Sequence, residues 1–163
     1  MDIRVGFGYD VHRLAPGVPF ALGGIEIPHH KGSVGHSDAD VLLHVICDAM
    51  LGAANLRDIG YQFPDNDPKY KGIDSKILLE KTIGLIHGHG YRLSNLDCTI
   101  CLQTPKINPF IPEMKRVISR ILQVDESRVS IKATTTETLG FVGREEGVSA
   151  YCVCLLIGGQ PQV

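Results

Sequence analysis

The segment VSAYCVCLLI, residues 148–157, is the most apolar strand expected in this chain. Its β-branched, aromatic and cysteine side chains favour a strand, and apolar residues occupy both alternating sets of positions. Because alternate side chains of a strand point to opposite faces of a sheet, both faces are expected to be buried here. Helices can cover one face. In a chain this short, we expect a second copy of the chain to cover the other.

The elements that precede this strand indicate an α+β fold. Working back along the chain, we expect strands over residues 129–133, 93–103, 20–27 and 4–11, with a turn or bulge at Gly23-Gly24. Caps and apolar periodicity predict helices that begin at Ser37, at Asp74 or Ser75, and at Pro109 to Pro112. Only part of this order alternates strand and helix, so we favour a mixed β-sheet with helices packed on one face over a doubly wound parallel sheet.

The first helix has clear expected boundaries. After a loop rich in Gly, Pro and His, Ser37 is the expected N-cap with Asp40 as its capping-box partner. Apolar residues follow at helical spacing and stop near Gly52. Residues 55–72 are rich in Pro, Asp and Gly and have no period of 3.6 or 2. We expect an irregular surface loop there, of the kind that carries function.

The composition describes one globular domain over residues 1–163. Hydrophobic residues make up 44% and charged residues 21% of the chain, far from the composition of disordered proteins. With 16 Lys and Arg against 18 Asp and Glu, the net charge of -2 argues against binding of nucleic acid or anionic membranes. No apolar run approaches the roughly 20 residues of a spanning helix, and charged Asp2 and Arg4 follow Met1, so we expect no signal or transit peptide.

The cysteines are expected to be buried, reduced thiols. Their number is five, and an odd number without an export signal is typical of a reducing cytosol. Cys98 and Cys101 form a C-x2-C pair, but they lie within a predicted strand, where positions three apart face opposite sides. A shared metal site is therefore not expected for this pair.

Two groups of metal-ligating residues are expected to meet. Asp10 and His12 end the first strand, where alternation puts both side chains on one face. Asp40 and His44 are i and i+4 on the first helix, with His36 just before it. Taken singly, these residues also fit a turn-capping carboxylate, a capping box and a core histidine. Together they offer one carboxylate and two imidazoles, the ligands of a catalytic Zn²⁺ with an open fourth position.

A third group follows a later strand. The sequence KATTTE, residues 132–137, places three hydroxyls and a carboxylate after a predicted strand. Hydroxyls and free backbone N–H groups suit phosphate oxygens, and a carboxylate suits Mg²⁺ or Mn²⁺ shared with those phosphates. The alternative is a threonine-rich turn that leads into a helix cap. A P-loop signature is absent, and Gly6 and Gly8 lack the third glycine of a dinucleotide fingerprint.

Five blocks in a fixed order resemble the 2-C-methyl-D-erythritol 2,4-cyclodiphosphate synthase family, the cyclases of the non-mevalonate isoprenoid pathway. The blocks are GYDVH at 8–12, HSDADVLLH at 36–44, DIGYQFPDNDPKYKG at 58–72, PK at 105–106 and KATTTETLGFVGREEG at 132–147. The resemblance covers the chain from Arg4 to Ile157. The ordered series is far more specific than any single block.

The resemblance implies a fold, an assembly and a reaction. The fold is a chorismate-mutase-like two-layer subunit, in a homotrimer whose sheets face the trimer axis and whose active sites lie between subunits. The reaction is the metal-dependent cyclisation of 4-diphosphocytidyl-2-C-methyl-D-erythritol 2-phosphate to the 2,4-cyclodiphosphate with release of CMP, by a phosphorus–oxygen lyase. A bacterial cytoplasmic enzyme fits better than a plastid precursor, because no transit peptide is expected.

The resemblance also assigns residues by their positions in the matching blocks. Asp10, His12 and His44 would hold Zn²⁺. Glu137 would hold a second divalent cation, Mg²⁺ or Mn²⁺. The catalytic residues that position phosphate and stabilise the transition state would be His36 and Thr135. Apart from His44, these metal-binding and catalytic residues would also contact substrate. The further substrate contacts would be Ser37, Asp58, Ile59, Gly60, Phe63, Pro64, Asp65, Asp67, Gln103, Pro105, Lys106, Ala133, Thr134, Thr136, Phe141 and Arg144.

Two positions depart from the family pattern. Asn66 stands where other members often have Thr, and Glu145 stands where many have Gly. The resemblance places Arg144 and Glu146 near a cavity on the trimer axis that accepts isoprenoid diphosphates. The extra negative charge of Glu145 beside Arg144 weakens the expectation of an anion there.

Two other functions fit the same residues. A Zn-dependent phosphoanhydride hydrolase would use the open Zn²⁺ position to activate water. A non-catalytic nucleotide-binding trimer would grip a nucleotide with residues 55–72 and turn nothing over. The products formed from the substrate distinguish these functions, because only a cyclase forms a cyclic diphosphate.

Overall fold

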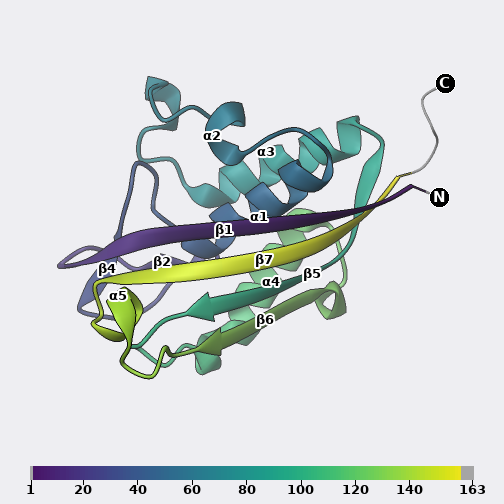
Figure 1. Cartoon of the computed structure of the whole chain (residues 1–163). Helices are drawn as coiled ribbons and strands as arrows, with labels where there is room; N and C mark the ends of the chain where they lie inside the picture. The colour runs from purple at the N-terminus through teal and green to yellow at the C-terminus, as the bar shows by residue number, and fades with distance from the viewer. Residues whose placement is uncertain (1, 159–163) are drawn as a thin grey trace.

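Three helices cover one face of a five-stranded sheet in the computed structural model, which describes residues 2–158 (Figure 1). In spatial order the strands are β4 (Lys31–Val34), β1 (Asp2–Pro16), β7 (Gly147–Gly158), β5 (Tyr91–Cys101) and β6 (Val129–Thr134). The helices are α1 (Val41–Ala53), α3 (Ser75–Gly88) and α4 (Ile111–Leu122). No helix within residues 2–158 has the length and apolar character needed to cross a membrane. The outermost residues of the expected domain, 1 and 159–163, lie outside the described residues.

The sheet is mixed, as the order of elements predicts. β5 and β6 run parallel, whereas β1 pairs antiparallel with β4 and β7, and β7 pairs antiparallel with β5. The predicted α+β class with helices on one face is therefore confirmed. The pairing of β1 with β7 runs from Asp2 opposite Gly158 to Arg13 opposite Gly147. The central strand β7 thus pairs with β1, which lies far from it in the sequence.

Short elements occupy the connections, and two of the expected loops contain regular structure. β2 (Ala21–Leu22) and β3 (Ile25–Glu26) pair around Gly23-Gly24, which confirms the predicted turn. The loop expected before the first helix contains β4, because β1 continues to Pro16 and offers it a partner. The loop expected over residues 55–72 contains α2 (Ile59–Gln62) and the 3₁₀ helix η1 (Pro68–Tyr70). The other short elements are η2 (Asn108–Phe110), η3 (Glu126–Arg128) and α5 (Gly140–Gly143).

α1 lies close to β1 because the strand has glycine where the helix crosses it. A Cβ atom at Gly6 would lie 1.8 Å from the carbonyl oxygen of Ala49. A Cβ atom at Gly8 would lie 2.2 Å from the carbonyl oxygen of Val45. Any other residue at these positions would push the helix backbone away from the sheet. The first turn of α1 therefore lies directly beside the part of β1 that follows Gly8.

Asp40 caps the N-terminus of α1 and is fully buried. Its carboxylate accepts hydrogen bonds from the backbone N–H groups of Leu43 at 3.0 Å, Gly23 at 2.9 Å and Gly24 at 2.7 Å. Burial raises the pKa of Asp40, and the three N–H donors oppose that rise. One carboxylate therefore joins the start of α1 to the turn between β2 and β3.

The predicted capping box of Ser37 and Asp40 is wrong. Ser37 Oγ accepts a hydrogen bond from the backbone N–H of Ala39, whose φ of 57° is left-handed and turns the chain away from a helix. The helix cap falls on Asp40, where buried N–H groups need an acceptor. Because Asp40 is buried against the β2–β3 turn, it also lies outside the polar stripe expected with His36 and His44.

Replacing Asp40 by alanine is expected to lower the free energy of unfolding by about 2 kcal/mol, because buried backbone N–H groups lose their acceptor. Urea unfolding at a fixed protein concentration measures the loss. The matched control is Asp125→Ala, since Asp125 caps η3 at the surface through the N–H of Ser127 at 2.8 Å. That variant is expected to lose less than about 1 kcal/mol. Equal losses in the two variants would mean that the buried turn does not depend on Asp40.

The face of the sheet away from the helices is exposed in the single chain, so the burial expected there would have to come from a second copy. The helix-facing residues Cys152, Cys154 and Leu156 are buried, as expected. On the outer face, Val5 is 67% and Phe7 is 62% exposed. The exposed apolar residues of this outer face, on β1 and β7, are Ile3, Val5, Phe7, Tyr9, Val11, Tyr151 and Val153. An apolar surface of this extent is characteristic of an interaction site.

The cysteines are free thiols, and four are buried. Burial raises the pKa of the Cys47 and Cys154 thiols to about 12. On β5, Cys98 is buried against the helices, whereas Cys101 is half-buried and three positions further along the strand. The C-x2-C pair therefore does not point at a shared site, as the strand assignment predicts.

Candidate metal centre

Asp10, His12 and His44 form the one group of three or more His, Cys, Asp or Glu residues within 2–158 whose ligating atoms converge. Those atoms all lie within 4.8 Å of one another. Asp10 Oδ2 is 3.0 Å from His12 Nε2 and 3.1 Å from His44 Nδ1, and the two imidazole nitrogens are 3.1 Å apart. This group, the metal cluster, brings together the two motifs that the sequence places on different elements.

The backbone explains this convergence. Asp10 and His12 follow Gly6 and Gly8 on the helix-facing side of β1, because alternate residues of a strand share a face. His44 precedes Val45, the residue whose carbonyl would clash with a side chain at Gly8. The metal cluster therefore lies beside the close contact of strand and helix at Gly8 and Val45.

The charges of the cluster favour a cation. Burial alone would raise the pKa of the Asp10 carboxyl, but hydrogen bonds from His12 and His44 outweigh it and hold the pKa below its ordinary value. Burial alone would lower the pKa of His44, but its hydrogen bond to Asp10 and the nearby carboxylates outweigh burial and raise the pKa above its ordinary value. The Asp10 carboxylate is thus ionised and favours positive charge on its neighbours. One oxygen and two imidazole nitrogens are a donor set that fits Zn²⁺.

The metal cluster lines a pocket of about 450 Å³, and its side chains are largely buried there. His36 is at the mouth of this pocket, largely exposed, with Nε2 3.8 Å from Asp65 Oδ2. The segment expected to be a functional loop thus forms a pocket wall. The remaining lining residues are Gly35, Ser37, Asp48, Ile59, Gly60, Phe63, Tyr70, Ile73 and Leu78.

Three predicted substrate contacts in the 58–67 segment do not line this pocket. Asp58 caps α2, where its carboxylate accepts from the N–H of Tyr61 at 2.9 Å. Asp67 caps η1 and lies 2.7 Å from the ammonium of Lys69. Pro64 lies between them and also stays outside the lining. Asp58 and Asp67 thus cap the two short helices of this pocket wall.

The other predicted site residues form a separate group at the ends of β5 and β6. Thr135 Oγ1 donates to Glu137 Oε1 at 3.2 Å, and the backbone N–H of Thr138 donates to Gln103 Oε1 at 3.3 Å. None of these predicted residues is buried. The group, here called the threonine loop group, comprises Gln103, Pro105, Lys106, Ala133, Thr134, Thr135, Thr136, Glu137, Phe141 and Arg144.

One chain does not bring the metal cluster and the threonine loop group together. Asp10 lies opposite Ala150 of β7, and Ala150 lies opposite Ile100 of β5. Ile100 in turn lies beside Ala133 of β6. Neighbouring strands are about 4.8 Å apart, so Ala133 is roughly 14 Å from Asp10 across the sheet. The two groups are level along the strands but separated by three strand spacings.

Comparison with known proteins agrees with the geometry. A model of the YgbB family matches residues 3–157 of the chain. The chain belongs to the YgbB family. Over 154 residues it is 62% identical to the 2-C-methyl-D-erythritol 2,4-cyclodiphosphate synthase of Porphyromonas gingivalis, and this alignment covers 94% of this chain and 95% of that protein.

The YgbB-family chain also resembles solved structures in its fold. The bifunctional IspDF from Campylobacter jejuni superposes with a TM-score of 0.93 at 40% identity, covering 98% of this chain and 43% of that one. The chain therefore spans less than half the length of the Campylobacter protein. The CDP complex of IspF from Plasmodium falciparum superposes with a TM-score of 0.85 at 34% identity, covering 97% of each chain.

Polar residues beyond the predicted set surround the metal cluster in this YgbB-family chain. Asp48 lies one turn after His44 on α1, and its Oδ1 accepts from the N–H of Ile59 at 2.7 Å. The i, i+4 spacing from His44 is a signal that identifies Asp48 in the sequence. Ser75 Oγ lies 2.9 Å from His44 Nε2 and contacts Asp38. No sequence pattern points to Ser75, which is 31 residues from His44.

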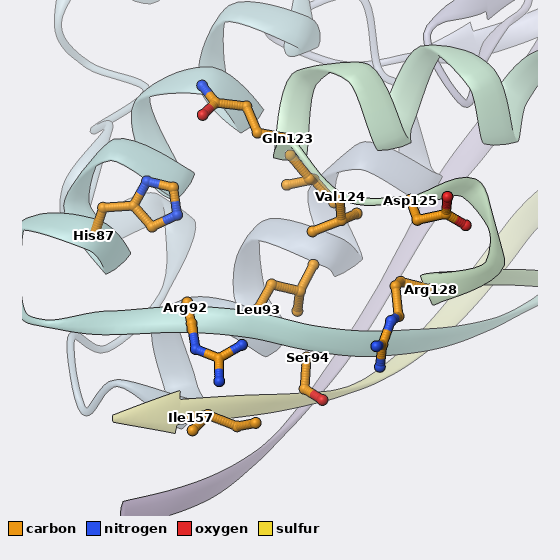
Figure 2. Close-up of a pocket in the computed structure, with 10 residues that line it drawn as sticks. His87, Arg92, Leu93, Ser94, Gln123, Val124, Asp125, Arg128 and Ile157 are labelled. Carbon is orange, nitrogen blue, oxygen red and sulfur yellow. The ribbon is translucent and has the colours of Figure 1, made fainter. Parts of the chain in front are cut away.

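A second pocket, of about 430 Å³, does not belong to this YgbB-family site (Figure 2). His87, Arg92 and Arg128 surround it, and α3 and α4 end beside it. Helix C-termini carry partial negative charge, which disfavours an anion and is compensated by such basic side chains. None of the predicted site residues lines this pocket. We therefore interpret the basic residues around this pocket as compensating the negative charge at the helix C-termini.

Proposed function

We propose that this chain cyclises 4-diphosphocytidyl-2-C-methyl-D-erythritol 2-phosphate to 2-C-methyl-D-erythritol 2,4-cyclodiphosphate with release of CMP, in the non-mevalonate pathway. The observation that carries the proposal is the convergence of Asp10, His12 and His44 in the wall of a pocket. A site with three protein ligands keeps a position for a substrate oxygen. The 62% identity to a synthase supports the reaction. A cytoplasmic location in a bacterium and a single domain over residues 1–163 are part of the proposal.

Two cations belong to the proposed site. Asp10, His12 and His44 would hold Zn²⁺, for which their donor atoms and mutual spacing within 4.8 Å are suited. Glu137 would hold Mg²⁺ or Mn²⁺, because its exposed carboxylate is the hard oxygen ligand that these ions share with phosphates. Bound cations would neutralise the phosphate oxygens and lower the barrier to their reaction.

The proposed reaction is an internal phosphoryl transfer. An oxygen of the 2-phosphate forms a bond to the β-phosphorus, the bond from that phosphorus to the oxygen of CMP breaks, and CMP leaves with the electron pair. Because no covalent intermediate with the protein is needed, the chain has chiefly to position the two phosphate groups. We assign this positioning to His36 and Thr135, with Ser37 beside His36.

We assign different parts of the substrate to the two groups of predicted contact residues. The CDP complex of the Plasmodium falciparum relative supports a cytidine nucleotide as part of the ligand. We assign the nucleotide and its phosphates to the threonine loop group. Phe141 and Arg144 of that group would make further substrate contacts. We assign the other end of the substrate to the segment that contains Asp58, Ile59, Gly60, Phe63, Pro64, Asp65 and Asp67.

We further propose a homotrimer whose outer apolar faces surround the three-fold axis and whose active sites lie between subunits. The exposed apolar side chains of β1 and β7 supply a surface that a copy of the chain would cover. The separation of roughly 14 Å between Asp10 and Ala133 supports the position of the sites, because a neighbouring subunit would bring its threonine loop group to the metal cluster. Closed rotational symmetry repeats that contact three times.

The proposal includes an axial site for an isoprenoid diphosphate near Arg144 and Glu146. Glu146 engages Arg144 through two hydrogen bonds of 3.1 and 3.0 Å. Glu145 has a φ of 57°, the left-handed conformation that glycine adopts most readily. Lys31 Nζ donates to the Glu145 carbonyl oxygen at 3.1 Å and lies 3.8 Å from its carboxylate. Lys31 therefore offsets the extra negative charge at this position.

The experiment that tests the function is phosphorus NMR of the protein with 4-diphosphocytidyl-2-C-methyl-D-erythritol 2-phosphate, Zn²⁺ and Mg²⁺. The expected result is a pair of coupled signals from a cyclic diphosphate together with CMP. Linear diphosphate or orthophosphate would identify a hydrolase instead. Unchanged substrate with saturable binding would identify a non-catalytic carrier.

Mixing two inactive variants is expected to restore activity if the sites lie between subunits. His44→Ala removes one side of each site and Glu137→Gln the other, and each variant alone should be nearly inactive. In trimers reassembled from equal amounts, about a quarter of the interfaces pair an intact metal cluster with an intact Glu137. We expect roughly that fraction of the parent turnover. Mixing without reassembly is the control, and no recovery after proven subunit exchange would place both groups within one subunit.

A further inference from the structure

We propose that Ser75 and Asp38 are positioning residues for His44, which hold a hydrogen on its Nε2 and thereby direct the lone pair of Nδ1 toward the metal cluster. The inference rests on the proposed Zn²⁺ site and adds two residues to it. Neither residue is among the predicted ligands or substrate contacts. Both lie outside α1, so they fix His44 from the neighbouring elements.

The two ring nitrogens of His44 have different partners. Nδ1 faces the metal cluster, 3.1 Å from Asp10 Oδ2 and 3.1 Å from His12 Nε2. Nε2 faces the opposite way, 2.9 Å from Ser75 Oγ and 3.1 Å from Ser37 Oγ. The His44 side chain is only 12% exposed, so these protein atoms are its main hydrogen-bonding partners. The ring orientation is therefore set by groups on both of its edges.

Asp38 determines the direction of the hydrogen bond between Ser75 and His44. An ionised carboxylate only accepts hydrogen bonds. Asp38 accepts from the hydroxyl of Ser75 at 2.5 Å and from its backbone N–H at 3.0 Å. A serine hydroxyl has one hydrogen, so Ser75 Oγ, having donated to Asp38, can only accept from His44. The hydrogen thus lies on Nε2, and once a bound metal ion replaces the proton that Nδ1 donates to Asp10, the neutral ring presents its free lone pair on Nδ1.

The location of Ser75 makes this arrangement rigid. Ser75 is the first residue of α3 and is fully buried. The backbone N–H of Asp38 donates to the carbonyl of Ile73 at 3.2 Å, which ties the segment before α1 to the start of α3. Ser37 is the more distant partner of His44 Nε2, at 3.1 Å against 2.9 Å for Ser75, and its Oγ also accepts from the N–H of Ala39 at 3.1 Å. Outer partners of this kind fix the orientation and tautomer of metal-binding histidines.

The test is the zinc affinity of Ser75→Ala, measured by competition with a chromophoric chelator. We expect affinity to fall about 10- to 100-fold, the usual effect of removing an outer partner of a ligating histidine. Asp38→Asn keeps the side-chain volume and is expected to weaken zinc binding in the same direction, so it serves if Ser75→Ala does not fold. The control is Ser119→Ala, which removes another buried helical hydroxyl, on α4, and should bind zinc like the parent.

Proton NMR of the zinc-loaded, ¹⁵N-labelled protein supplies a second readout. The His44 Nε2 proton should be observed in the parent and in Ser119→Ala, and lost through exchange in Ser75→Ala. Zinc affinities within twofold of the parent in both Ser75→Ala and Asp38→Asn would overturn the positioning role. Parent-like zinc affinity in His44→Ala would instead overturn the metal site itself, and with it the inference. The two failures are therefore distinguishable.

Discussion

Replacing His44 by alanine is expected to remove the bound zinc and to lower turnover about a thousandfold. The variant retains Asp10 and His12, and two ligands are too few for a site that uses three. Charge stabilisation by a bound cation contributes several kcal/mol, and about 4 kcal/mol corresponds to a rate factor of roughly a thousand. Metal content by mass spectrometry and product formation by phosphorus NMR measure the two effects.

His87→Ala is the matched control for this experiment. His87 lies in the last turn of α3 and lines the other pocket, away from the metal cluster. Its replacement should change neither zinc content nor turnover. Chelation of the parent should reproduce the loss seen in His44→Ala, and added zinc should rescue only the parent. Near-normal turnover by a zinc-free His44→Ala protein would contradict the metal assignment.

Gly6→Ala is expected to lower the free energy of unfolding by more than about 3 kcal/mol, at the upper end of the range for overpacked cores. The new methyl group would lie 1.8 Å from the carbonyl oxygen of Ala49, so α1 has to move off the sheet. In a protein of this size such a loss lowers the melting temperature by roughly 10 °C. Zinc affinity should fall as well, because His44 moves with the helix while Asp10 stays on the strand.

Gly52→Ala is the corresponding control, because Gly52 lies in α1, the helix that Gly6 contacts. A Cβ atom at Gly52 has no neighbour within 4 Å, so alanine there should raise stability by about 0.5–1 kcal/mol. Thermal unfolding of both variants at one protein concentration gives the comparison, since assembly makes the midpoint depend on concentration. A Gly6→Ala protein as stable as the parent would mean that close contact between α1 and β1 is not required.

The metal cluster is predictable from sequence because its parts follow simple periodicities. Asp10 and His12 share a face of a strand, and His44 lies at the start of a strongly apolar helix. The contact between strand and helix is less accessible to such reasoning. Gly6 and Gly8 create that contact, yet in the sequence they look like an incomplete dinucleotide motif. Their role appears only when the helix is placed over them.

Features that depend on distant segments could not be predicted in the same way. Ser37 and Asp40 are both good helix caps, and the choice falls on Asp40 because the turn at Gly23-Gly24 presents N–H groups to it. The order of strands is equally hidden. Alternation does not reveal that β7 and β5 lie between β1 and β6. The distance between the metal cluster and Glu137 therefore follows from topology alone.

The pairing of Asp2 with Gly158 has a consequence for how this protein can be combined with others. These residues are neighbours at one end of the sheet, where β1 and β7 run side by side (Figure 1). Asp10 lies roughly 27 Å further along β1, at about 3.4 Å per residue. A domain fused near either residue would stand clear of the pocket, so gene fusion is compatible with an intact active site. In the bifunctional Campylobacter jejuni protein, the matched region is 43% of the chain.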